Sequence, residues 1–127
     1  MKDLEEAESW LDAANFTLAN ASKGRARFTV AVAQSIHALI KANDALSMHL
    51  LGRRSTRHED AAVMFGTLIR QNKIDPEYAR LRSLLTRAVK AKPLYDYKGT
   101  EAGQEEAKKW VREVAKFIES VREILGG

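Results

Sequence analysis

The chain has 127 residues, 45% of them hydrophobic and 30% charged, which is the balance of one globular domain and excludes a disordered segment. It contains no cysteine, and this excludes a disulfide scaffold, a thiolate metal site and a cysteine nucleophile. The amino terminus is acidic, and no apolar run approaches the ~20 residues of a membrane span, so we expect a cytoplasmic protein that does not enter a membrane.

The net charge of +4 is unevenly distributed along the sequence. Residues 52–92 contain ten Lys or Arg against four Asp or Glu, a local charge of +6, whereas the remainder has eleven against thirteen, a charge of −2. A basic middle segment favours partners that carry phosphate. The alternative is that these side chains only cover solvated helix faces, since charge alone is a weak signal.

Apolar residues recur every three or four positions along most of the chain, which is the period of amphipathic α-helices. The first such segment, residues 4–20, has acidic residues in its opening turns, where they suit the positive end of the helix dipole. The second, residues 25–51, is apolar over so broad a surface that we expect it at the centre of a bundle, and also at a dimer seam. Gly52 should end it.

A third helix is predicted after a basic turn. Thr56 and Glu59 have the spacing of a capping box, so this helix should begin near Arg57 and end near residue 71. Its core face should consist of Ala62, Phe65, Leu68 and Ile69.

Two proline positions define the fourth helix. Asp75 followed by Pro76 is a strong start signal, and Pro93 should stop the helix near residue 91. Residues 93–103 then form one long loop, and a regular apolar repeat predicts a last helix over residues 104–125. The expected fold is all-α: an antiparallel up-and-down bundle of about five helices in a single domain, residues 1–127.

Arg53 and His58 form an Arg-x4-His pattern in the basic turn. An arginine can hold a phosphate by two hydrogen bonds, and a histidine can move protons near neutral pH. Together they supply the minimum for metal-independent cleavage of RNA at a 2′-hydroxyl. The alternative is that His58 only packs in the first turn of its helix.

A second cluster, Tyr95-Asp96-Tyr97, lies in the predicted loop close to Lys92. Two tyrosines beside an acid and a lysine can stack a base and position a phosphate. The alternative is that the tyrosines cover the end of the bundle. Three arginines complete the candidate RNA or nucleotide contacts: Arg54 and Arg57 in the basic turn, and Arg87 on the fourth helix.

No motif predicts a metal site or a cofactor. Gly-rich phosphate loops, His-Glu-x-x-His and Gly-x-Ser-x-Gly are missing from the sequence. His37 and Lys41 are one helical turn apart, which resembles a phosphotransfer pair, but His37 lies among apolar residues and this disfavours that role.

Several short motifs occur in an order that resembles the HEPN family of small helical domains. A long alanine-rich second helix is followed by a glycine turn and Ser-x-x-His, here Gly52 to His58. A fourth helix then leads to Asp-Tyr, here Asp96-Tyr97, and the last helix begins Glu-Glu-Ala at Glu105. The resemblance covers nearly the whole chain.

The resemblance implies an up-and-down bundle that forms a homodimer and is associated with nucleotides or RNA. Many HEPN proteins pair with a small nucleotidyltransferase, often as a toxin–antitoxin couple. Some are metal-independent endoribonucleases that use Arg-x4-6-His between their last two long helices. This chain has Lys92 and no histidine there, so a binding module is favoured over an enzyme, and a structural adaptor that binds another protein is a third alternative.

Overall fold

The computed structural model describes residues 2–126, and over this range the chain forms five α-helices, three short 3₁₀ helices and no strand. This confirms the all-α fold class. The α-helices are α1 (Lys2–Ala19), α2 (Ala26–Leu51), α3 (Ala61–Arg70), α4 (Arg82–Asp96) and α5 (Gln104–Ile124), and the 3₁₀ helices are η1 (Ala21–Lys23), η2 (His58–Asp60) and η3 (Pro76–Leu81).

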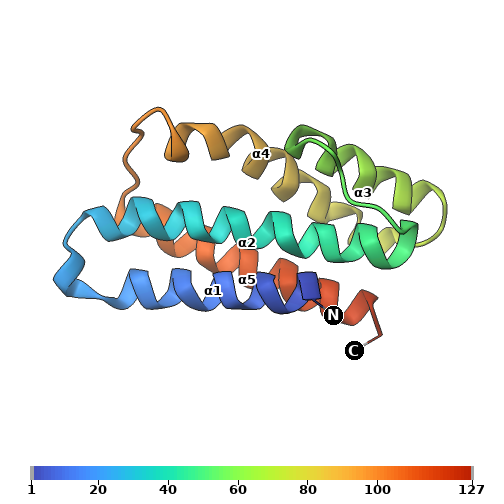
Figure 1. Cartoon of the computed structure of the whole chain (residues 1–127), viewed down its shortest axis with the longest axis horizontal. Helices are drawn as coiled ribbons and strands as arrows, with labels where there is room; N and C mark the ends of the chain where they lie inside the picture. The colour runs from blue at the N-terminus through green and yellow to red at the C-terminus, as the bar shows by residue number, and fades with distance from the viewer. Residues whose placement is uncertain (1, 127) are drawn as a thin grey trace.

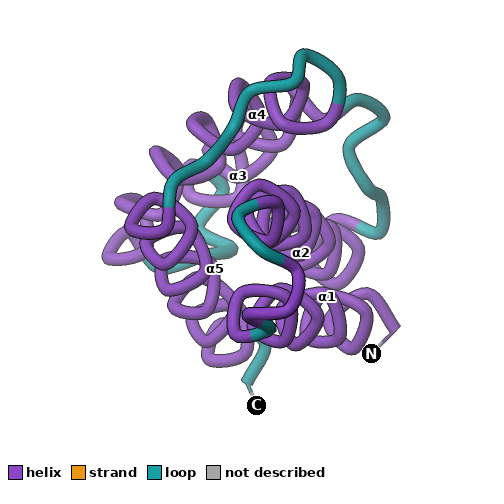
Figure 2. The backbone as a smooth tube through the Cα atoms, turned by 90° about the vertical axis from the view of Figure 1, so that its left-hand side faces the viewer, coloured by secondary structure: helices purple, strands orange, loops and turns teal. Residues whose placement is uncertain are grey.

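Helix α2 lies at the centre of the bundle, as its broad apolar surface predicted. It packs against α1, α3, α4 and α5, and Figure 2 shows these helices arranged around it. Figure 1 shows α1 antiparallel to α2 on one side and the α3–α4 pair on the other, with α5 behind. The apolar residues of α2 are largely buried within this one chain, so the width of its surface requires no second subunit.

The core forms where α2, α3 and α5 meet. Phe65 of α3 and Phe117 of α5 are fully buried, with their ring centroids 6.3 Å apart. Ile36, Leu39 and Leu46 of α2 complete this cluster and are likewise buried. At the end of α2, Gly52 has φ +74° and donates its backbone N–H to the carbonyl of Met48, which confirms it as the helix stop.

The predicted capping box at Thr56 and Glu59 is wrong. Helix α3 begins at Ala61, and residues 58–60 before it form the separate turn η2. No side chain caps η2 or α3, and the Glu59 carboxylate lies 3.6 Å from Nε of Arg57. The Glu59 carboxylate therefore contacts Arg57 and not the backbone N–H that a capping box requires.

The fourth helix also differs from its prediction at both ends. Asp75 caps it as expected, accepting the N–H of Glu77 at 2.9 Å, but the first six residues form η3 before α4 begins. Pro93 does not stop α4, which continues to Asp96. Proline lacks only one N–H donor, and the turn after it is held by the Lys92–Asp96 pair and by the Tyr97 N–H donated to the Pro93 carbonyl at 3.0 Å.

Candidate functional site

A group of titratable side chains meets along one face of α2. His37, Lys41 and Asp44 follow one another at helical spacing, and each is half-buried. Side chains from α1, from α4 and from residues 52–60 approach them. We call the whole group the polar cluster; its members are Asp3, Glu6, His37, Lys41, Asp44, Arg54, His58, Lys92 and Asp96.

His37 lies at the middle of the polar cluster. Its ring contacts the edge of Trp10, with the centroids 4.3 Å apart. Burial lowers the pKa of His37, and the positive charges of Lys92, Lys41 and His58 lower it further, whereas Asp96 opposes them. Burial, the largest of these causes, therefore favours the neutral form of the imidazole.

His37 lies beside apolar residues, as expected, but charged groups that the sequence did not point to also act on it. Ala38 and Leu39 next to it in sequence point into the core, but His37 itself faces charged groups from α4 and η2. Those groups are far away in sequence, so the neighbouring residues alone could not reveal the site.

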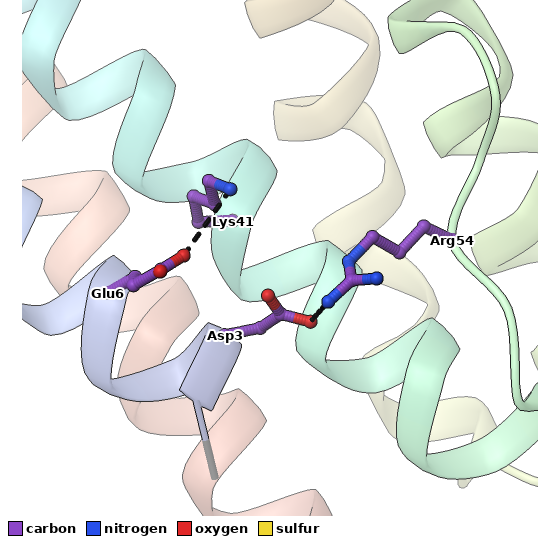
Figure 3. A network of polar contacts seen from close by, with 4 residues as sticks. All are labelled: Asp3, Glu6, Lys41 and Arg54. Atoms are coloured by element: carbon purple, nitrogen blue, oxygen red, sulfur yellow. Dashed lines mark hydrogen bonds and ion pairs between the residues drawn. The ribbon is translucent and has the colours of Figure 1, made fainter.

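A second part of the polar cluster joins α1 to the loop of residues 52–60 (Figure 3). Asp3 is 5% exposed, and its Oδ2 accepts a hydrogen bond from Nη2 of Arg54 at 2.8 Å. One turn along α1, Glu6 Oε2 lies 3.4 Å from Lys41 Nζ. Burial raises the pKa of Asp44, and the negative charge of Asp3 raises it further.

Arg54 therefore has a structural partner and is not a free RNA contact. The hydrogen bond to Asp3, followed by that carboxylate's charge, raises the pKa of Arg54. This ion pair fastens the loop to α1 and so fixes the segment that leads to His58.

Arg53 and His58, the predicted catalytic pair, are both exposed, and within residues 2–126 no hydrogen bond or ion pair joins them. The charge of His58 acts instead on His37 and Asp44. Arg57 forms ion pairs with Glu59 and with Asp60, whose Oδ2 lies 3.5 Å from Arg57 Nε. The structure thus brings His58 to the polar cluster and leaves Arg53 outside it.

Tyr95 and Asp96 belong to the last turn of α4 and not to a loop, and Tyr97 follows as the C-cap residue of the helix. Asp96 pairs with Lys92 one turn earlier, while Tyr95 donates its hydroxyl to Glu106 of α5. Burial and that hydrogen bond raise the pKa of Tyr95 to about 12. Tyr97 is 82% exposed, so its ring is accessible to solvent, unlike that of Tyr95.

Arg87 lies apart from these groups. Its Nη1 is 3.3 Å from Oε2 of Glu113 on α5, so it bridges two helices on another face. Among the described residues, no group of three or more His, Asp or Glu side chains is placed to hold a metal ion. Over the same range, no helix is both long enough and apolar enough to cross a membrane.

The basic middle of the sequence forms one side of the molecule. Residues 52–92 comprise the loop after α2, η2, α3, η3 and most of α4, and Figures 1 and 2 show these elements together on one side of α2. Ten Lys and Arg side chains are therefore gathered in one layer, which we call the basic layer. Three of them, Arg54, Arg87 and Lys92, pair with carboxylates outside residues 52–92, and the others keep the layer positive.

A scan of protein-family models finds no match to this chain, and a search of curated proteins finds none either. The similarity to HEPN domains thus stays a prediction from the sequence motifs.

Proposed function

We propose that the protein is a HEPN-type helical module that binds RNA or a nucleotide through its phosphate groups. The observation that carries this proposal is the concentration of positive charge in the basic layer. A polyanion gains most of its affinity from such a surface, because each phosphate contact releases condensed counterions.

The polar cluster at the edge of this layer supports the same proposal. Lys41, Lys92 and His58 all act on His37 from this cluster, and a bound phosphate could contact these cations in competition with their carboxylate partners. The exposed side chains of Arg53 and His58 have no ion-pair partner within residues 2–126, so they are available to an anion. The exposed Tyr97 ring offers a surface on which a base can stack.

The test is binding of a labelled single-stranded RNA, followed by fluorescence anisotropy over a range of salt concentrations. The logarithm of the binding constant should fall with the logarithm of salt by about 0.7 for each phosphate contacted. Arg53→Gln combined with Lys90→Gln should weaken binding and reduce this slope. The matched control is Lys109→Gln combined with Arg112→Gln, which removes the same charge from exposed positions of α5. Equal losses in the two double variants would contradict a binding surface in the basic layer.

A ribonuclease is the second candidate, and the environment of His37 favours it. A neutral imidazole can accept the proton of a ribose 2′-hydroxyl as that oxygen bonds to phosphorus, and His58 can protonate the departing 5′-oxygen. The products would be a 2′,3′-cyclic phosphate and a free 5′-hydroxyl. Lys92 would stabilise the charge on the phosphorane. This assignment replaces Arg53 with His37 as the partner of His58.

Incubation of the purified protein with labelled RNA in EDTA separates the two candidates. Cleavage that is lost in both His37→Ala and His58→Ala would establish the enzyme. Intact RNA that remains bound would support the binding module and remove the ribonuclease for that substrate class.

The homodimer, the nucleotidyltransferase partner and the toxin–antitoxin role also belong to this proposal and rest on the HEPN resemblance. An exposed apolar area supports the dimer: Phe16 of α1 is 71% exposed and Val30 of α2 is 46% exposed, and both line one depression. Sedimentation showing a monomer at micromolar concentration would count against it.

A further inference from the structure

Two arginine side chains converge on a glycine at the α3–α4 contact, outside the polar cluster. Gly66 is buried in the middle of α3. A Cβ atom placed on it would stand 3.3 Å from Nη1 of Arg82 and 3.4 Å from Nη1 of Arg70. The two Nη1 atoms are therefore no farther apart than the sum of these distances.

This proximity brings two positive charges together without a compensating carboxylate. Nε of Arg82 donates to the carbonyl of Ala62 at 3.1 Å, and Nη2 of Arg70 donates to Oγ1 of Thr67 at 3.0 Å. Neither guanidinium forms an ion pair with any described Asp or Glu. Each of these groups has five N–H donors, so most of the donors at this point have no protein acceptor.

The surroundings leave this site open to solvent. Both arginines are exposed, and together with Gly66, Ile69 and Ala79 they line a shallow depression. The hydrogen bonds to Ala62 and Thr67 hold the guanidiniums in place, so their repulsion is not relieved by one of them turning away. A bound oxyanion would both relieve the repulsion and fill the unused donors.

We propose that Arg70 and Arg82 form a phosphate-binding site over Gly66. The ligand is a phosphate group, supplied either by the backbone of an RNA bound to the basic layer or by a free phosphate compound. The glycine is part of the site, because its missing side chain lets both guanidiniums approach the helix backbone. The RNA source rests on the proposed function, whereas the phosphate site itself does not.

The first experiment titrates the full chain with inorganic phosphate and follows the arginine Nε–H signals by NMR. The Nε signals of Arg70 and Arg82 should shift together, while that of Arg112, an exposed arginine on α5, should not. Arg82→Gln should weaken phosphate binding by about tenfold or more, the loss expected for a charge-assisted hydrogen-bonding group.

Gly66→Ala is the sharper variant, because it keeps both positive charges. The added methyl group should shift the Arg82 guanidinium by a few tenths of an ångström and crowd that of Arg70, and this change in their spacing should weaken phosphate binding. Alanine favours the helix, so the protein should unfold at the same or a higher temperature. Unchanged phosphate affinity in a folded Gly66→Ala protein would overturn the role of the glycine. Signals of Arg70 and Arg82 that do not move, or that move no more than Arg112, would overturn the site.

The source of the phosphate is decided by RNA binding to the Arg70→Gln, Arg82→Gln double variant. A salt slope reduced by about 0.7 relative to the wild type would identify an RNA phosphate as the ligand. An unchanged slope with phosphate binding lost would identify a free phosphate compound. If the wild type binds no RNA at all, the proposed function fails, and the phosphate titration still decides this site.

Discussion

The ion pair between Asp3 and Arg54 should stabilise the fold by an amount that a double-mutant cycle can measure. Asp3 is buried, its partner's side chain is 46% exposed, and their hydrogen bond is 2.8 Å long. A hydrogen bond to a charged group contributes about 1.5–3 kcal/mol, and half-exposure to water lowers this. We therefore expect a coupling free energy of about 1–2 kcal/mol.

The two single variants should lose different amounts of stability, because Asp3 is buried and Arg54 is half-exposed. Arg54→Met leaves the Asp3 carboxylate buried without a partner and close to Asp44, whose pKa its charge already raises. Asp3→Asn leaves a guanidinium that water can solvate. Arg54→Met should consequently cost more stability than Asp3→Asn.

Thermal and urea unfolding of the wild type, both single variants and the double variant give the coupling free energy. With an unfolding entropy of about 2.1 cal/mol/K per residue, a loss of 1–2 kcal/mol lowers Tm by about 4–7 °C in a chain of this length. A coupling below about 0.3 kcal/mol, or a larger loss in Asp3→Asn than in Arg54→Met, would refute the reasoning.

Three further predictions follow from the polar cluster and from α4. Asp44→Asn should stabilise the protein at neutral pH, because a carboxyl group whose pKa is raised on folding destabilises the folded state when it is charged. This gain in the free energy of unfolding should decrease as the pH falls through the raised pKa and vanish below pH 3.8. A gain that does not depend on pH in urea unfolding would contradict the prediction. NMR titration should show that the pKa of His37 rises in Lys92→Gln and falls in Asp96→Asn. Titration curves identical to that of the wild type would show that these two charges do not act on His37. Pro93→Ala should stabilise the protein by up to about 3 kcal/mol, the cost of proline relative to alanine in a helix interior, and unchanged urea unfolding would show that Pro93 costs α4 nothing.

The helices were predictable because their apolar period is a local property of the sequence. Residues 25–51 and 104–125 were predicted within a residue or so of α2 and α5, since Gly52 and the regular repeat mark them directly. The errors at Glu59 and Pro93 have a different origin. In both places a charged side chain pairs with a side-chain partner, Arg57 with Glu59 or Lys92 with Asp96, and the local pattern on which the prediction relied does not report such pairs.

The polar cluster could be predicted only in pieces. His58, Lys92 and Asp96 were identified from their residue types, but their relation to His37 depends on how α4 and η2 pack against α2. Arg70 and Arg82 carried no sequence signal beyond their positive charge, because Gly66 and Arg70 lie on α3 whereas Arg82 reaches them from α4 through a contact that only the packing sets. Periodicity reports which face of a helix is buried and does not report which polar residues of different helices meet.

The central position of α2 also constrains how the protein can be synthesised and folded. Of the five helices, α5 is translated after the other four, and it supplies Val114, Phe117 and Val121 to the core around α2. Until that helix emerges, the nascent chain exposes part of the apolar surface of α2 to water and to other nascent chains. A chain cut before Gln104 would keep this surface exposed, because the contacts between α2 and α5 could not form.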